Sequence, residues 1–219
     1  MGEDPYAKTA KGYDSVVEPF VRKLRTIGMK MFPLHRGVSV LDVGCGTGTH
    51  LGIYQKTGCR VFGIDSSPAM LDVAQMKLAG RAKLHLGDAS RMPFPDESFD
   101  LVQAVFILHE VPAPIRSLVV DEAKRVMKKN GRFLVIDYHP VSVQFPIGWP
   151  YKIVITLLEI LAGWEHFRNY RDFITSGGLL PLVAQNGLQV DKRRVVGGGT
   201  LGLYLLSRSR SSPKQNTNG

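Results

Sequence analysis

Cysteines, a signal peptide and unbroken apolar runs are scarce or missing in this sequence. Two cysteines in 219 residues cannot build a disulfide framework, so a reducing compartment is expected. No charged, apolar and small-residue signal peptide opens the chain, which makes the cytoplasm the expected location. The longest apolar stretch, Val143 to Gly163, contains two prolines, a lysine and a glutamate. We therefore reject a membrane span there.

Clusters of metal-ligating side chains are also missing from the sequence, and we predict no metal site. The 28 basic residues outnumber the 19 acidic ones and give a net charge of +9. Such an excess fits nucleic acid, an anionic lipid, an acidic substrate or a merely soluble surface. The positive charges are spread along the chain and are not interleaved with aromatic residues as in a single-strand binder. A solvated surface is favoured, and nucleic acid stays an alternative partner.

The chain is organised around the glycine-rich stretch from Leu41 to Thr49. The apolar residues 37–40 before it predict a buried strand, and residues 51–56 after it predict the start of a helix. The spacing G-x-G-x-G differs from the dinucleotide fingerprint, and no Lys-Ser or Lys-Thr follows, which excludes a phosphate-binding P-loop. Asp42 at the strand end would repel a pyrophosphate and attract an ammonium group. The loop therefore predicts a cationic ligand.

Two further predicted strands end in an acidic residue. Residues 61–65 end in Asp65, about 20 residues after the loop, where a carboxylate can accept both hydroxyls of a ribose. Ser66-Ser67-Pro68 then caps and begins a helix. Residues 83–89 contain Gly87-Asp88 at the end of a third strand, and residues 93–102 lead into a fourth.

These motifs, in this order, resemble those of class I S-adenosylmethionine-dependent methyltransferases. The segment Phe106-Ile107-Leu108-His109-Glu110-Val111-Pro112, together with Tyr13-Asp14, resembles the UbiE type, which includes quinone-biosynthesis C-methyltransferases. Glu110 replaces that group's usual second histidine. The resemblance covers about residues 6–140. It implies an α/β fold: a Rossmann-like, seven-stranded, mostly parallel sheet with helices on both faces and an antiparallel last strand.

The resemblance also implies the cofactor S-adenosyl-L-methionine, with S-adenosyl-L-homocysteine as product. Asp42 would act through the loop backbone on the methionine amine, and Asp65 would hold the ribose. Met70 would pack on the adenine, whose edge Asp88 and Ala89 would contact. The amides at the start of the helix after the loop favour the methionine carboxylate. The predicted cofactor-binding residues are Tyr13, Asp42, Gly44, Cys45, Gly46, Gly48, Asp65, Ser66, Met70, Asp88, Ala89, Ala104 and Val105.

We predict a single methyltransferase domain over 1–207, with an N-terminal helical lid over 1–35 and a disordered basic tail over 208–219. Tyr6 or Tyr13 would close on the cofactor, or only pack the first helix onto the domain. The insert 141–178 is expected to form the acceptor pocket. In it the polar residues Lys152, Thr156 and Glu159 share one stripe, which leaves a broad apolar face for the core, a dimer contact, a membrane interface or a pocket roof. The predicted substrate-binding residues are His139, Trp164, His166 and Tyr170.

A sulfonium methyl group is already reactive, so the protein needs mainly to align the acceptor and exclude water. A base is required only if the acceptor must first lose a proton. His109 is the predicted base, with the alternative that it orients its loop or contacts the cofactor. His139, His166 and the two tyrosines are further candidates.

The predicted function is methyl transfer to a small apolar or amphipathic acceptor by a monomer or homodimer that can associate peripherally with membranes. A quinone precursor and the amine head group of a phospholipid are both acceptors that would suit the apolar insert 141–178. An RNA or protein methyltransferase is one alternative, although no Asn/Asp-Pro-Pro-aromatic motif follows the fourth strand. A non-catalytic adenosylmethionine-binding partner subunit is another, but it would not need the intact loop and acids.

Overall fold

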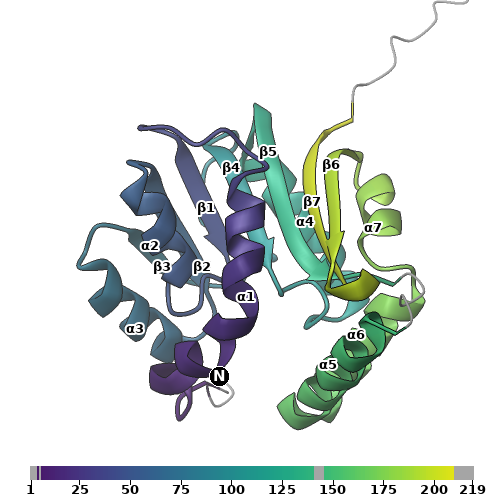
Figure 1. Ribbon diagram of the computed structural model, residues 1–219. Helices are drawn as coiled ribbons and strands as arrows, with labels where there is room; N and C mark the ends of the chain where they lie inside the picture. The colour runs from purple at the N-terminus through teal and green to yellow at the C-terminus, as the bar shows by residue number, and fades with distance from the viewer. Residues whose placement is uncertain (1–3, 5, 141–145, 210–219) are drawn as a thin grey trace, which may run out of the picture.

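The computed structural model describes residues 4, 6–140 and 146–209, so residues 141–145 of the insert and 210–219 of the expected tail lie outside it. Seven strands form one sheet in the order β3-β2-β1-β4-β5-β7-β6 (Figure 1). All neighbouring strands are parallel except β7, which runs antiparallel to both β5 and β6. The predicted antiparallel last strand is thus confirmed. The strands are β1 Ser39–Val43, β2 Arg60–Asp65, β3 Lys83–Leu86, β4 Phe99–Val105, β5 Met127–Tyr138, β6 Leu188–Val196 and β7 Leu201–Arg208.

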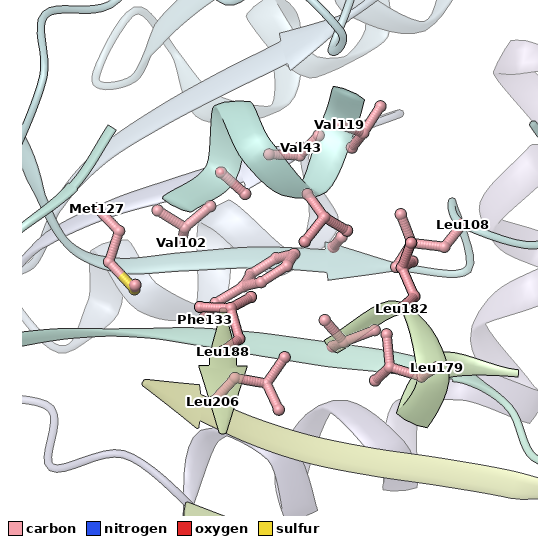
Figure 2. Close-up of a cluster of buried hydrophobic side chains, with 14 of the residues drawn as sticks. Val43, Val102, Leu108, Val119, Met127, Phe133, Leu179, Leu182, Leu188 and Leu206 are labelled. Carbon is pink, nitrogen blue, oxygen red and sulfur yellow. The ribbon is translucent and has the colours of Figure 1, made fainter. Parts of the chain in front are cut away.

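Helices cover both faces of this sheet. They are α1 Tyr13–Met29, α2 Thr49–Lys56, α3 Pro68–Leu78, α4 Ala113–Val126, α5 Gly148–Ala162, α6 Trp164–Thr175 and α7 Leu179–Gln185. Short 3-10 turns at Ala10–Gly12 and Gly197–Gly199 precede α1 and join β6 to β7. Alternate strand residues point to opposite faces: Val40 belongs to the core formed with α1, α2 and α3, whereas Leu41 belongs to the core formed with α4, α6 and α7. Figure 2 shows the second of these cores, where Phe133 of β5 lies near Val102 and Leu206.

The strand order reverses between β1 and β4, where one connection turns toward β2 and the other toward β5. In open α/β sheets a ligand binds beyond the carboxyl ends of the strands at such a switch point. The glycine loop follows β1, and the segment after β4 lies beside it. The beginning of α1 and the α5–α6 pair also lie at this end of the sheet (Figure 1).

The apolar pattern of residues 115–129, followed by Asn130-Gly131, predicts a helix that ends at a carboxyl cap. The helix ends earlier in the structure: α4 stops at Val126, and Asn130 and Gly131 both belong to β5. Met127 already pairs with Phe99, and the register then shifts before Leu101 pairs with Arg132. A side chain at Gly131 would lie 3.0 Å from the carbonyl oxygens of Phe99 and Lys128. The glycine therefore permits a close backbone approach and caps no helix.

The apolar face of helix α5 does not pack into the core, which was one of the roles expected for it from the sequence. Glu159 of its polar stripe is buried, and Thr156 is half-buried against the body of the protein. The apolar residues face outward instead, and Leu161 is 82% exposed. Across the described ranges, with their gaps at residue 5 and at 141–145, no helix has the length and apolar character needed to cross a bilayer.

Candidate active site

A cavity of about 810 Å³ opens at the switch point of the sheet. Its wall combines the glycine loop, the ends of β2 and β3, the segment after β4 and one face of α1. Ligand pockets for drug-sized molecules have volumes of about 300–1,000 Å³. Eleven of the thirteen residues that the sequence predicted for the cofactor lie on this wall: Tyr13, Asp42, Gly44, Cys45, Gly46, Asp65, Ser66, Met70, Asp88, Ala89 and Val105.

Gly48 and Ala104 are the two predicted cofactor residues that do not line the cavity. Ala104 is 1% exposed and packs inside β4 with the hydrophobic core. An added side chain at Gly48 would lie 2.8 Å from the Leu78 side chain, so this glycine lets α2 begin close against α3. Both positions thus contribute to packing behind the cavity wall.

The glycine loop leaves room for a ligand on one side and meets protein on the other. A Cβ atom at Gly46 would touch nothing within 4 Å, because the residue faces the open cavity. A Cβ atom at Gly44 would lie 2.1 Å from Cδ1 of Ile107, in the segment after β4. Both residues have positive φ values, 65° and 51° for Gly44 and Gly46, which non-glycine residues rarely adopt.

Asp65 fastens the loop while it lines the cavity. Its Oδ2 accepts a hydrogen bond from the Gly46 N–H at 2.7 Å, and its Oδ1 accepts one from the Ser67 N–H at 2.9 Å. Each carboxylate oxygen has a second lone pair, which leaves two acceptor positions for a vicinal diol. Burial raises the pKa of Asp65, although these backbone hydrogen bonds lower it.

Three ionisable side chains meet behind the glycine loop. Burial raises the pKa of Asp42 to about 7, although the neighbouring Gln103 amide and Arg25 guanidinium lower it. Arg25 of α1 lines the cavity and pairs with Glu18. Its Nε has no hydrogen-bond partner among the described residues, and neither ring nitrogen of His50 has one. Burial lowers the pKa of His50 to about 3.

The sequence-based prediction missed Arg25 and His50. A sequence signal for Arg25 exists, because Tyr13, Val17, Val21 and Arg25 follow one another at intervals of four residues and all line the cavity. A cation that ends an otherwise apolar helix stripe points to an anionic group of a ligand. The sequence around His50 gives no such signal, because His50, at the start of α2, meets Arg25 only once α1 has folded over the glycine loop.

The N-terminal segment closes one side of the cavity. Tyr6 and Tyr13 line it, and their rings meet edge to face with centroids 6.0 Å apart. Asp14 accepts hydrogen bonds from Thr47 at 2.6 Å and Thr49 at 3.1 Å and pairs with Lys77 of α3. The helix is thereby tied to the glycine loop that it covers.

His109 lies behind the cavity wall and not on it. Its Nδ1 is 2.7 Å from Oδ1 of Asp137, and its side chain is 2% exposed. Burial alone would lower the pKa of His109, but the Asp137 carboxylate raises it to about 9. Oδ2 of Asp137 also accepts the Leu108 N–H at 3.0 Å. This position fits the alternative, orientation of the loop, and does not place the imidazole against an acceptor.

Glu110, the next residue, does line the cavity and had no assigned role in the sequence analysis. The other acids on the wall lie beside the glycine loop, β2, β3 or the start of α3. Glu110 is therefore the carboxylate that the segment after β4 contributes to the wall. Phe106, with a φ of 58°, precedes it on the same wall.

The four predicted substrate-binding residues are not brought together in the main cavity. His139 is buried between the Tyr204 hydroxyl, 2.6 Å from Nδ1, and Arg193, 2.8 Å from Nε2. Tyr170 packs on Tyr138 and, like His139, lines a small separate pocket. Trp164 is 76% exposed on the outside of α6. His166 lies 3.4 Å from Glu159 and 3.7 Å from Glu110, next to the cavity wall.

The residues present fit a nucleoside that carries an amino-acid tail. Asp65 offers acceptors for the ribose, and the open side of Gly46 leaves room beside it. The unpartnered Nε–H of Arg25 and the one N–H of the neutral His50 imidazole suit a carboxylate, because buried polar atoms need hydrogen-bond partners. Asp42 supplies negative charge for an ammonium group.

Comparison with known proteins gives consistent results. Residues 41–135 match the family model described as a methyltransferase domain. A protein of Synechocystis sp. described as an uncharacterized methyltransferase is 30% identical over 177 residues, which cover 75% of this chain and 73% of that relative. A demethylmenaquinone methyltransferase of Tropheryma whipplei is 37% identical over 144 residues, or 62% of this chain and 58% of that relative. The chain thus matches less than two thirds of the second relative's length.

The fold also has solved counterparts. A putative methyltransferase of Haloferax volcanii, solved with the Trm112 methyltransferase activator, superposes with a TM-score of 0.71 at 17% identity and covers 95% of this chain and 100% of that one. At this identity the likeness concerns the fold alone. Together with the matched sequence relatives and the glycine loop beside Asp65, the comparisons show that the chain belongs to the class I S-adenosylmethionine-dependent methyltransferases, in the UbiE-type group.

Proposed function

We propose that this protein binds S-adenosylmethionine in the main cavity and transfers its methyl group to an apolar or amphipathic small molecule. The observation that carries the proposal is the continuity of the cavity, which runs from the glycine loop and Asp65 to Tyr6, Tyr13 and Glu110. One cavity thereby offers a cofactor end and an acceptor end.

At the cofactor end the proposed contacts follow the geometry. Asp65 accepts the ribose hydroxyls through its free lone pairs, and Met70 packs against the adenine, whose edge Asp88 and Ala89 meet. Arg25, with His50 beside it, holds the methionine carboxylate, while Asp42 attracts the ammonium group. This assignment adds a side-chain partner for the carboxylate to the helix amides that the sequence suggested.

At the acceptor end the wall is mostly apolar. Besides the two tyrosines it presents Val17, Phe106, Ile107, Val111 and Ile115. The T. whipplei relative is named for demethylmenaquinone, an apolar acceptor. The outward apolar side of α5, with the exposed cations Lys152, Arg168 and Arg171 on α5 and α6, supports contact with an anionic membrane that could supply such an acceptor. The acceptor proposed is therefore a quinone-like or lipid-like molecule.

The bound cofactor supplies an electrophilic methyl group, and the protein orients the acceptor and excludes water. Tyr6 and Tyr13, fastened over the cavity through the N-terminal segment, shield it from solvent. Glu110 lies where an acceptor hydroxyl or activated carbon would release its proton, so we assign to it the role of base that the sequence gave to His109. His109 then holds the loop through Asp137.

Calorimetric titration tests the cofactor end. S-adenosylmethionine and S-adenosylhomocysteine should bind the parent, and Asp65→Ala should weaken both by about tenfold or more, because the charged hydrogen-bond acceptor for the ribose is lost. Asp72→Ala, which removes an exposed carboxylate from α3, is the matched control. Equal affinity of Asp65→Ala and the parent would show the ribose assignment to be wrong.

The acceptor class is tested with S-adenosylmethionine carrying a tritiated methyl group in a cell extract fractionated into quinones, phospholipids, small polar molecules, RNA and protein. We expect label in the quinone or phospholipid fraction, dependent on Glu110 and lost in Glu110→Gln. Label confined to RNA or protein would overturn the apolar acceptor. Cofactor binding without any label would instead indicate a non-catalytic binding subunit.

A further inference from the structure

Three side chains of metal-binding type meet beside the cavity, although the sequence predicts no metal site. His109 comes from the loop after β4, Glu159 from α5 and His166 from α6. Each offers one ligand atom, and these atoms all lie within 4.8 Å of one another. Glu159 and His166 follow His109 by 50 and 57 residues, which is why no spacing motif revealed the group.

The distances inside this group are unusual for hydrogen bonds. Nε2 of His109 is 3.6 Å from Oε1 of Glu159, and Nε2 of His166 is 3.4 Å from Oε2. A direct bond between an imidazole and a carboxylate is closer to the 2.7 Å seen between His109 and Asp137. Ligands of a tetrahedral Zn²⁺ at about 2.1 Å are roughly 3.4 Å apart. The two histidine–carboxylate distances are therefore close to those between ligands of a shared cation.

The central carboxylate has one oxygen that a shared cation would satisfy. Glu159 is 5% exposed, and its Oε2 has no hydrogen-bond partner among the described residues. Its other oxygen accepts a hydrogen bond from the Tyr138 hydroxyl at 2.7 Å. A buried carboxylate oxygen without a partner is costly, and a metal ion between it and the two imidazoles would remove that cost.

Neighbouring groups also hold the ligands in place. With its Nδ1–H donated to Asp137, His109 turns Nε2 toward Glu159, and the neutral imidazole has its lone pair on that nitrogen. Metal-ligating histidines are held in this way by a second carboxylate that fixes the tautomer and the ring orientation. Tyr138 fixes the carboxylate of Glu159 through its hydroxyl. The ligand set is therefore organised by side chains that do not touch the ion themselves.

We propose that His109, Glu159 and His166 bind a Zn²⁺ ion through Nε2, a carboxylate oxygen and Nε2. Two imidazoles and one carboxylate are a ligand set that Zn²⁺ accepts, with a fourth position for water. Glu110 of the cavity wall lies 3.7 Å from Nε2 of His166. The ion ties α5 and α6 to the loop that follows β4. This proposal stands independently of the methyl acceptor.

The test uses the full chain freed of metal by dialysis against a chelator and then equilibrated with Zn²⁺. We expect one Zn²⁺ per chain by elemental analysis, and a visible absorption band when Co²⁺ replaces it. His166→Gln and Glu159→Gln should weaken Zn²⁺ binding at least about tenfold. His35→Ala removes an exposed imidazole elsewhere and should bind as the parent does.

Thermal unfolding provides the second readout, because an ion that binds only the folded state raises the melting temperature. Zn²⁺ should raise it for the parent and for His35→Ala but not for His166→Gln. His166 is only half-buried, so its variant should fold even if Glu159→Gln does not. A parent that takes up no Zn²⁺ or Co²⁺, or a His166→Gln protein that binds as tightly as the parent, would overturn the proposal.

Discussion

The surroundings of several ionisable residues around the cavity shift their pKa values, and Asp42 is the clearest case. Burial raises its pKa to about 7 from 3.8. A carboxyl group with a higher pKa in the folded state contributes stability that is complete below pH 3.8 and is lost as the pH rises through about 7. The difference corresponds to at most roughly 4 kcal/mol. The residue that attracts the ligand's ammonium group therefore destabilises the ligand-free protein at neutral pH.

Asp42→Asn removes this titration. Urea unfolding of the ligand-free proteins between about pH 4 and pH 8 should show the parent losing stability relative to the variant as the pH rises, because only the parent must bury a charged carboxylate. If the two free energies of unfolding change in parallel with pH, Asp42 does not titrate in this range.

Arg25 is assigned to the methionine carboxylate alone, and that assignment can be tested with a ligand that lacks this carboxylate. Arg25→Met should bind S-adenosylmethionine about 10- to 100-fold more weakly, since a charge-assisted hydrogen bond contributes about 1.5–3 kcal/mol. The same variant should bind methylthioadenosine, which lacks the methionine carboxylate, as well as the parent does. Calorimetry with both ligands would reveal an equal loss if Arg25 acted only on the fold.

At the scale of elements, the order of strands and helices was predictable from the sequence, whereas the faces of some elements were not. Strand ends marked by Asp42, Asp65 and Asp88 were placed correctly, because apolar runs that end in a glycine or an acid are local signals. Local signals did not predict which side of α5 faces the protein. Its buried polar residues find partners far away in the sequence, as Glu159 does in Tyr138. The same holds for Arg25, which acquires its place only when α1 covers the glycine loop.

The fastening of α1 to the glycine loop rests on one side chain. Asp14→Ala removes the acceptor of Thr47 and Thr49 and the partner of Lys77. We expect a several-fold loss in S-adenosylmethionine affinity and faster amide hydrogen exchange near Tyr13. The melting temperature should fall little, because Leu24 still packs α1 on the sheet.

Asp121→Ala, which removes an exposed acid from α4, serves as control for this change. Unchanged exchange near Tyr13 in the Asp14 variant would mean that packing alone holds the helix in place.

At the scale of the whole molecule, the proposed membrane contact depends on the α5 face and on positive charge. The net charge is +9, and α5 turns Leu157 and Leu161 toward solvent at the same end of the sheet as the cavity. A bilayer with anionic lipids would meet these leucines together with the exposed cations Lys152, Arg168 and Arg171 of α5 and α6. An acceptor dissolved in that bilayer would then have a short path to Tyr6 and Glu110.

The double variant Leu157→Gln/Leu161→Gln should bind anionic vesicles at least about tenfold more weakly in a sedimentation assay, because burial of each leucine contributes about 1.5–3 kcal/mol. Val190→Gln, an exposed apolar position on β6, should bind as the parent does. Dimer dissociation in the double variant, with no vesicle binding by the parent, would assign the face to a second copy of the chain.

Gly44 and Ile107 lie against each other and belong to two parts to which the proposed function assigns different molecules. Gly44 is in the turn proposed to receive the sulfonium donor, and Ile107 is in the wall proposed to receive the methyl acceptor. A methyl group added at Gly44 would lie only 2.1 Å from Cδ1 of Ile107, so neither residue can be changed without affecting the other. Grafting a foreign 106–112 segment to change which compound is methylated should therefore also alter donor affinity, and successful swaps will be those that preserve the isoleucine's shape.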